Sequence, residues 1–265
     1  ALSSAASDVY KRQEEYVPKT KKVTTLAGYI HFMLSGENAV GIGEASGIFP
    51  VDMTGYDKNK MKKYADKIAS HGYDNDIYSL FPAVKSAGEK GAYLTEEGAR
   101  FLDPTGSLKA GVPLCPPEGD AGTGMVATNS VRAGTGNISA GTSVFSMLVL
   151  SEPLAAVHRE IDMVTTPDGY PVAMVHCNSC CTELDAWVNM FGEFGALMGC
   201  DIDKSELYEK LYRNAMNAAP DCGGAVAYGF MSGEPAANVE KGYPAYFRSP
   251  EHAPTPVSYT HLRAH

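Results

Sequence analysis

Two glycine-rich segments near the middle of the chain, residues 117–125 and 133–143, most constrain how it can fold. They read Pro-Glu-Gly-Asp-Ala-Gly-Thr-Gly-Met and Ala-Gly-Thr-Gly-Asn-Ile-Ser-Ala-Gly-Thr-Ser. Glycine lets the backbone turn sharply and approach a ligand closely, and successive free N–H groups with Thr and Ser hydroxyls can bind an anion. The simpler interpretation is that these glycines only shape tight turns. Composition and spacing leave both interpretations open.

Known glycine motifs fit these segments and one earlier segment poorly. Residues 136–143 read G-x-x-x-x-G-T-S, but Thr142 stands where a P-loop has lysine, and a strand-like apolar run follows where a P-loop needs a helix. Gly41-Ile42-Gly43 lacks the last glycine of the dinucleotide-binding fingerprint, and the sequence predicts no strand before it. Asp120 opens a D-x-G-T sequence like the first phosphate loop of actin-like ATPases, but it follows Cys-Pro-Pro-Glu rather than an apolar strand. We reject the P-loop, and the other two matches carry little weight.

The composition excludes several classes of protein. Hydrophobic residues make up 44% of the 265 residues and charged residues 20%, so the chain can bury a sizeable core. The formal net charge of −9 argues against binding to the phosphate backbone of nucleic acids. No apolar run reaches the length of a membrane span, and no export signal is visible. Six cysteines are too few for a disulfide scaffold, so we expect a soluble, cytoplasmic and reduced protein.

Both ends of the chain have the character of sequencing adapters. Residues 8–13 (Asp-Val-Tyr-Lys-Arg-Gln) and 257–262 (Val-Ser-Tyr-Thr-His-Leu) back-translate to nearly reverse-complementary DNA. That DNA resembles the mosaic end of transposon-based sequencing adapters. We therefore interpret residues 1–13 and 257–265 as adapter-derived tails that pack against nothing. On this interpretation residues 14–256 are a piece of a longer protein.

Helical and strand-like patterns alternate along the chain. Helices are predicted where apolar residues recur every three to four positions, at residues 20–34, 58–70, 121–130, 182–198 and 204–217. Strands are predicted at residues 170–176 and 225–231, and as a pair around a Gly-Thr-Ser turn within 137–150. Asp57 and Asp203 are the expected N-caps of two helices, and residues 88–117 are turn-rich with short strands. This mixture predicts an α/β or α+β fold with a domain boundary near residues 130–134.

A cysteine cluster suggests a zinc site. Residues 176–181 read His-Cys-Asn-Ser-Cys-Cys. A structural zinc site needs four ligands, usually with a second pair, and Cys200 and Cys222 each stand alone. We therefore expect buried or half-buried thiols here rather than a metal site.

Five short motifs in order resemble the FGGY family of carbohydrate kinases. They are Leu34-Ser35-Gly36-Glu37, Glu44-Ala45-Ser46-Gly47, Gly119-Asp120, Ser139-Ala140-Gly141-Thr142-Ser143 and Met231-Ser232-Gly233-Glu234. Each motif alone is weakly specific, but five motifs in this order with sensible spacing are a strong signal. The resemblance covers residues 14–249 and is nearest to the pentulose and hexulose kinases.

The resemblance implies a fold and a domain organisation. It implies an α/β fold of the actin-like (ribonuclease H-like) ATPase type, present in part. Residues 14–130 would be the C-terminal part of the sugar-binding domain, and residues 131–256 the N-terminal part of the nucleotide-binding domain. The two domains would meet near residues 130–133 at a cleft. The family's N-terminal phosphate loop, with its metal-binding aspartate, and its adenosine-binding glycine motif have no counterpart in this chain.

The resemblance also implies roles for individual residues. Asp120 would be the catalytic base that receives the proton of a sugar hydroxyl, and Gly119 and Asp120 would contact the substrate. Gly141, Thr142 and Ser143 would contact the phosphates of ATP. The implied cofactors are ATP and Mg²⁺, with no metal ligand expected within this chain. Ala121 stands where the family often has glutamine, which puts substrate contacts at that position in doubt.

Two classes of function are consistent with these residues. The first is ATP-dependent phosphorylation of a ketose sugar by the full-length protein, this chain alone being inactive. The second is a non-catalytic actin-like module for binding or assembly, which has no need of the carboxylate of Asp120. The expected partner is a small-molecule sugar, not nucleic acid or a membrane. The sequence does not name the sugar, and it leaves open a homo-oligomer of the full-length protein.

Overall fold

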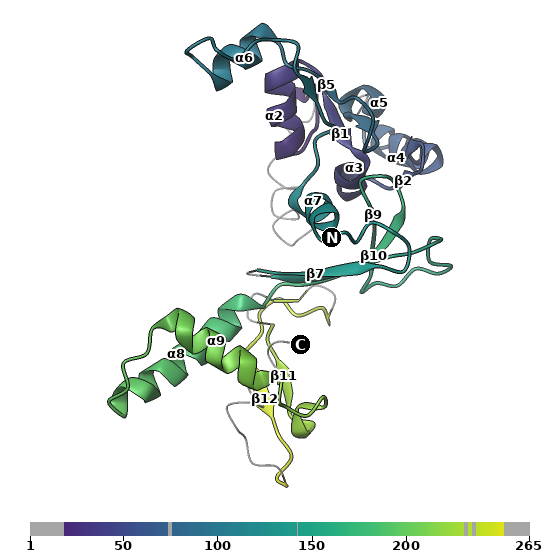
Figure 1. Ribbon diagram of the computed structural model, residues 1–265. Coiled ribbons are helices and arrows are strands. Elements are labelled where there is room, and N and C mark those ends of the chain that lie inside the picture. Colours follow the sequence, from purple (N-terminus) through teal and green to yellow (C-terminus); the bar gives the residue numbers. More distant parts are fainter. Residues whose placement is uncertain (1–18, 74–75, 142, 231–232, 235–236, 252–265) are drawn as a thin grey trace. The chain divides into compact units, whose positions relative to one another are not determined.

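The chain divides into two compact units (Figure 1). Unit 1 is drawn from residues 1–137 and 146–175, and unit 2 from residues 138–145 and 176–265. The computed structural model describes residues 19–73, 76–141, 143–230, 233–234 and 237–251 of these. The tails at 1–13 and 257–265 lie outside the described residues, so their expected lack of packing stays a prediction.

Helices and strands alternate in both units. The helices of unit 1 are α2 (Leu26–Ser35), α3 (Ile42–Ile48), α4 (Lys58–Ala69), α5 (Ile77–Leu80), α6 (Glu96–Leu102) and α7 (Asp120–Ala127). Its strands are β1 (Ala39–Gly41), β2 (Val51–Asp52), β3 (Gly55–Tyr56), β4 (Ala83–Lys85), β5 (Ala92–Tyr93), β6 (Pro113–Leu114) and β9 (Asp162–Thr165). Strands β7 (Gly136–Ala140), β8 (Val144–Val149) and β10 (Pro171–Cys177) contribute to both units. Unit 2 also holds α8 (Cys181–Leu197), α9 (Lys204–Ala215), the 3-10 turn η2 (Cys222–Gly224), β11 (Val226–Tyr228) and β12 (Ala245–Phe247).

The largest sheet has four strands in the order β7-β8-β10-β9. The predicted strand pair around the Gly-Thr-Ser turn is therefore confirmed as β7 and β8, and the strand predicted at 170–176 is β10. Strand β9 was not predicted, because four residues are too short to show a periodic pattern. It is a strand because it pairs antiparallel with β10, with Pro171 opposite Thr165. In unit 1, β1 and β4 form a separate parallel pair.

The core of unit 1 gathers around helix α3, which lies beside β9 in Figure 1. Val40, Ile42 and Val172 are each at most 1% exposed. The Thr165 hydroxyl donates to the carbonyl of Ile42 (3.1 Å), and the Thr165 amide donates to the Ser46 hydroxyl (3.2 Å). These contacts hold α3 in a defined place, and residues 117–118, described below, are hydrogen-bonded to its first turn and its N-cap.

Side-chain caps set the start of several helices, and two of these caps were predicted. Asp57 accepts from the amides of Asn59 and Lys60 at the start of α4, and Asp203 caps α9 in the same way. Helix α2 ends at Gly36, whose φ of 77° lies in the left-handed region that glycine tolerates best. It begins at Leu26 rather than near residue 20, because the Thr25 side chain caps it there.

Helix α6 lies in the segment that we expected to be only turns and short strands. Thr95 caps it by accepting from the Gly98 amide, and the amide and hydroxyl of Thr95 both donate to the Leu34 carbonyl. Gly98 lies directly against the backbone of Leu34 at the end of α2. The helix has only seven residues and includes a glycine, so its sequence pattern is weak.

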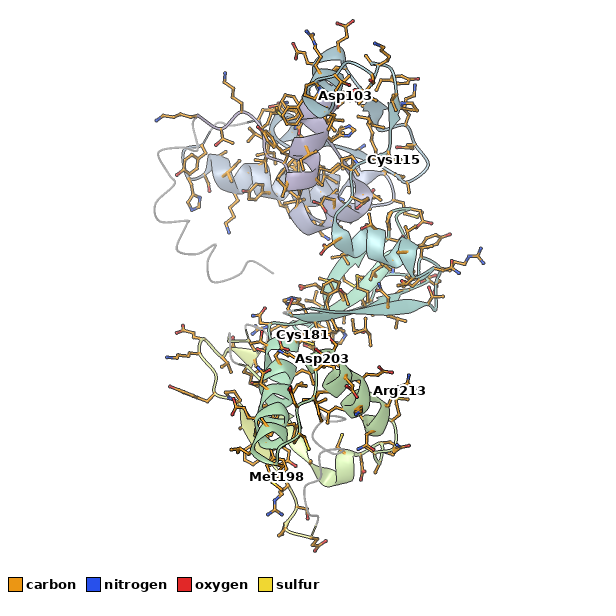
Figure 2. The ribbon with its side chains drawn as sticks, turned by 60° about the vertical axis from the view of Figure 1, so that its left-hand side comes forward. Asp103, Cys115, Cys181, Met198, Asp203 and Arg213 are labelled. Carbon is orange, nitrogen blue, oxygen red and sulfur yellow. The ribbon has the colours of Figure 1, made fainter. Side chains whose placement is uncertain are left out.

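Helix α8 in unit 2 follows its predicted bounds closely, but its apolar stripe is buried only in part. Leu184 and Val188 are buried, whereas Phe194 is 64% and Leu197 85% exposed. The apolar spacing that predicts this helix would place Phe194 on its core face, but Phe194 is not part of the core. Nothing in the described part of the chain covers the last turn of α8, which ends beside Met198 (Figure 2). No described helix combines the length and apolar character needed to span a membrane.

Candidate active site

The carboxylate of Asp120 is exposed at the first residue of α7. Gly119 is the N-cap, and an acidic side chain in the first turn favours the helix because backbone N–H groups point toward it. The Thr123 hydroxyl donates to the backbone carbonyls of Gly119 (3.0 Å) and Asp120 (3.2 Å), which tightens this turn. The Asp120 carboxylate accepts no hydrogen bond from any described residue. It is therefore open to a hydroxyl from a ligand.

The segment before Asp120 is held to the start of α3 by three hydrogen bonds. The Gly41 amide donates to the Pro117 carbonyl at 2.7 Å. The amides of Gly43 and Glu44 donate to the two carboxylate oxygens of Glu118, Oε1 at 3.0 Å and Oε2 at 2.8 Å. We call these contacts the Glu118 clamp. The sequence motifs did not predict it, although an acidic residue beside Gly119 and the glycine spacing at 41 and 43 were visible signals.

The glycines around this clamp are required by close approach. A Cβ atom on Gly43 would lie 2.7 Å from Oε2 of Glu118, and one on Gly41 would overlap Oε1 of the same carboxylate. A Cβ on Gly119 would overlap the carboxylate of Glu44. Interiors this densely packed do not absorb an added methyl group without displacement. The glycine at 119 thus has a packing reason of its own, and its proposed contact with substrate stays a prediction.

The pKa of the Glu118 carboxyl group also lies well above its ordinary value. Burial raises its pKa to about 7, and the negative charge of Glu44 acts in the same direction. The two backbone amides favour the ionised carboxylate and oppose this shift, but they are outweighed. Glu118 therefore changes charge near neutral pH.

We expect this shift to make folding stability depend on pH. The folded chain holds the Glu118 proton more tightly than the unfolded chain, so the contribution of Glu118 is greatest below the ordinary pKa of 4.5 and is lost as pH rises through about 7. Glu118→Gln replaces the titratable carboxyl group with an amide that does not titrate and keeps the size and shape of the side chain. The stability of the variant relative to wild type should therefore rise by about 1–3 kcal/mol between roughly pH 5 and pH 8. Urea unfolding across this range measures the difference, and a difference that is flat with pH would contradict the assignment.

A groove of about 700 Å³ lies beside the clamp in unit 1. Glu118, Thr123 and Val126 form part of its wall, and Thr123 lies one helical turn from Asp120 on the same side of α7. Lys90 also lines the groove, and its ammonium donates to the Tyr93 hydroxyl at 2.9 Å. The groove is within the size range of sites for small molecules.

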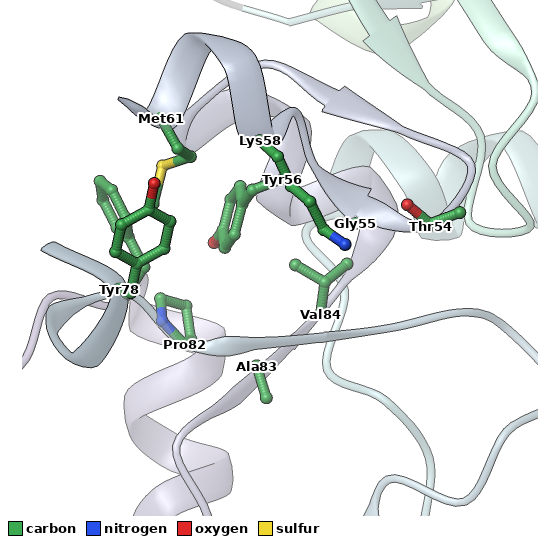
Figure 3. Close-up of a pocket in the computed structure, with 10 residues that line it drawn as sticks. Thr54, Gly55, Tyr56, Lys58, Met61, Tyr78, Pro82, Ala83 and Val84 are labelled. Atoms are coloured by element: carbon green, nitrogen blue, oxygen red, sulfur yellow. The ribbon is translucent and has the colours of Figure 1, made fainter. Parts of the chain in front are cut away.

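A second hollow of about 400 Å³ lies between β3, α4 and β4 (Figure 3). It contains Tyr56, whose hydroxyl is buried with no hydrogen-bond partner among the described residues. Burial raises the pKa of that hydroxyl. Lys58 and Tyr78 also line this hollow, but no carboxylate does. It cannot supply an ionised base at neutral pH, so the site around Asp120 is the better candidate.

In unit 2, the tip of the β7–β8 hairpin carries the residues expected to contact phosphates. The Gly141 amide donates to the Ser143 carbonyl (2.8 Å), and the Cys181 amide at the start of α8 donates to the Gly141 carbonyl (3.0 Å). The structure thus brings Gly141 and Ser143 together and anchors them to α8. Thr142 lies outside the described residues. The predicted cleft shared by Asp120 and this hairpin stays a prediction.

The cysteine cluster follows the hairpin anchor in unit 2. Cys177, Cys180 and Cys181 are half-buried with free thiols, as expected from the sequence. Burial raises the pKa values of Cys177 and Cys180, and the Cys177 thiol donates to the Ser179 carbonyl at 3.7 Å. Among the described residues no three His, Cys, Asp or Glu side chains come together as a metal site.

Comparison with known proteins places these elements in a family. Residues 136–262 match the profile of the FGGY family of carbohydrate kinases, C-terminal domain. A search of curated proteins gave no significant match. The fold is similar to a xylulose kinase from Rhodospirillum rubrum (16% identity, TM-score 0.67), covering 96% of this chain and 47% of that one. It is also similar to a gluconate kinase from Lactobacillus acidophilus (12% identity, TM-score 0.63), covering 91% of this chain and 45% of that one. A third similar structure is Plasmodium falciparum glycerol kinase with ADP (10% identity, TM-score 0.61), covering 98% of this chain and 48% of that one.

The chain spans about half the length of these solved kinases. At such low identity the likeness shows the fold, and it confirms the predicted partial actin-like α/β architecture. The family profile independently covers the hairpin, α8 and α9. Residues 136–262 therefore belong to the C-terminal domain of the FGGY family of carbohydrate kinases, and the fold of the whole chain is that of the solved kinases of this kind.

Proposed function

We propose that this chain is part of an ATP-dependent kinase that phosphorylates a hydroxyl group of a ketose sugar, a pentulose or hexulose. The observation that carries the proposal is the Asp120 carboxylate at the start of α7. It is exposed, and it accepts no hydrogen bond from a described residue. The xylulose kinases among the similar structures support a ketose substrate, whereas the gluconate and glycerol kinases mark the alternatives.

The proposed role of Asp120 is that of a general base. Its carboxylate accepts the proton of the sugar hydroxyl as the hydroxyl oxygen bonds to phosphorus. A loose phosphoryl-transfer transition state needs this proton only late, so an aspartate suffices. Help of this kind contributes about 10²–10⁴-fold to the rate, and positioning supplies much of the rest.

The hairpin residues fit a role at the phosphates. Gly141 is exposed, and only the Ser143 carbonyl, at 3.8 Å, lies near the position of its missing side chain. The Ser143 hydroxyl makes no hydrogen bond to a described residue. We propose that Gly141, Thr142 and Ser143 approach the phosphates of ATP, which when bound supplies the transferred phosphoryl group. No step is assigned to Mg²⁺, because the described residues provide no cluster to hold it. With ATP as donor, we place the enzyme in the cytoplasm.

A coupled assay of ADP release tests the substrate class. In the longer protein that contains this chain, we expect turnover with one or more pentuloses or hexuloses, and little with gluconate or glycerol. The chain alone should give none, because it spans about half of the solved kinases and half a site cannot align the hydroxyl with the phosphate. Turnover by the chain alone would show that the active site is misplaced. Nucleotide binding without turnover on any sugar would favour the non-catalytic binding module.

A further inference from the structure

The segment that carries Asp120 is fixed by a side chain as well as by its backbone. Glu118 precedes Asp120 by two residues, and both of its carboxylate oxygens accept backbone amides from α3, 75 and 74 positions earlier in the chain. A carboxyl group held at both oxygens cannot rotate freely, and in its ionised form these hydrogen bonds are charge-assisted, which makes them among the stronger ones in proteins. The contact therefore holds residue 118 against α3 with a defined orientation.

The surroundings leave the Glu118 carboxylate little freedom to move. The position of a Cβ atom on Gly122 is 3.1 Å from Oε2 of Glu118 and 3.2 Å from the ring of Pro167. Gly43 of α3 and Gly41, the N-cap of that helix, pack against the same carboxylate. The half-buried carboxylate thus lies between the first turn of α3 and Gly122 of α7, with too little space for a methyl group on that glycine.

This arrangement sets where α7 begins. Between Glu118 and Asp120 there is only Gly119, whose backbone is extended (φ −75°, ψ 176°). Farther along α7, Met125 is 1% exposed, and its carbonyl accepts the Ser130 hydroxyl. Helix α7 is therefore anchored at Glu118 before its first residue and at Met125 in its second turn. Loss of the first anchor would free mainly the turn that carries Asp120.

We infer that Glu118 is a positioning residue of the kinase site, which places the Asp120 carboxylate by clamping residues 117–119 to the start of α3. This inference rests on the proposed function for the role of Asp120. Glu118 itself touches backbone amides of the protein, and its effect on the reaction passes through the position of Asp120.

The inference predicts a loss of turnover with little loss of sugar binding. Displacement of a reacting group by about 1 Å can cost about 10²-fold in rate. In the longer kinase, Glu118→Ala should lower kcat by about 10²-fold, with the KM for sugar within about threefold of wild type. Glu118→Gln keeps the length and one carbonyl acceptor, so it should recover at least a tenth of the wild-type kcat. A side chain that only contributes to stability would not divide kcat from KM in this way.

Glycines in α3 and at its N-cap provide the matched variants. A Cβ on Gly41, the N-cap, would overlap the Glu118 carboxylate, so Gly41→Ala should displace it and reproduce the fall in kcat. The kcat of the double variant Gly41→Ala/Glu118→Ala should lie within about threefold of the kcat of the slower single variant, because both changes disrupt the same contact. Gly47→Ala lies on the same helix with no atom within 4 Å of the added methyl group, and its kcat should match wild type.

Two results distinguish failure of this inference from failure of the proposed function. If Asp120→Asn abolishes turnover while Glu118→Ala keeps wild-type kcat, the clamp does not position the base and the inference is overturned. If Asp120→Asn remains active, the proposed function itself fails.

A measurement on this chain needs no activity and serves also where Glu118→Ala does not fold. Hydrogen exchange at one of the two amides, that of Gly43 or of Glu44, should be at least about tenfold faster in Glu118→Gln than in wild type, because one of the two accepting oxygens is replaced by a donor. Exchange at these two amides that is unchanged in Glu118→Gln would overturn the clamp.

Discussion

Asp120→Asn should abolish most sugar phosphorylation by the proposed longer kinase while leaving ATP binding intact. The amide keeps the size and shape of the side chain but cannot accept a proton at neutral pH. We expect kcat to fall by about 10²–10⁴-fold, with the apparent affinity for ATP within about threefold of wild type. The carboxylate has no hydrogen bond to a described residue that the substitution would break, so folding should be little affected.

A coupled assay of ADP release, with nucleotide binding measured separately, checks this result. Asp66→Asn is the matched control, because Asp66 is also exposed on a helix of unit 1, α4, with no ligand role proposed for it. Its kcat should equal that of wild type. Near-normal turnover by the Asp120 variant would remove the proposed base from the mechanism and would leave the actin-like binding module as the better account.

Gly98→Ala should destabilise unit 1 by about 2–3 kcal/mol, against the sign that helix propensity alone predicts. In an open helix the change from glycine to alanine gains about 1 kcal/mol. In α6, however, the new Cβ would lie 2.9 Å from the carbonyl carbon of Leu34 and would overlap its oxygen. That oxygen accepts two hydrogen bonds from Thr95, so it cannot move away without breaking them.

Gly47→Ala gives the control for this effect, since its added methyl group meets no atom within 4 Å and should cost nothing or gain up to about 1 kcal/mol. Denaturation followed by far-ultraviolet circular dichroism measures both variants. The single tryptophan, Trp187, lies in unit 2, so its fluorescence should change less in Gly98→Ala than the dichroism does. Equal or greater stability of Gly98→Ala would mean that α2 and α6 are not packed as described.

Local features of this protein were predictable from its sequence, because the interactions that set them span only a few residues. Asp57 and Asp203 cap helices by bonding amides two and three positions away. The hairpin of β7 and β8 forms around its predicted turn, and α7 begins within one residue of its predicted start. The five family motifs, ordered along the chain, indicated the kinase family and singled out Asp120 as the candidate base.

Tertiary structure decided the contacts that join distant parts of the chain. The bonds from Gly43 and Glu44 to Glu118 cross more than 70 positions, and no local pattern marks Glu118 as half-buried or titrating near neutral pH. The same holds for Gly98. The sequence marks it only as a residue of low helix propensity, whereas in the fold it packs against the backbone of Leu34 at the end of α2. The apolar stripe of α8 misled in the opposite direction, since periodicity shows which side of a helix is apolar but not how far along its length another element covers it. Burial and close approach depend on which segments meet, and that depends on the whole fold rather than on any short stretch of sequence.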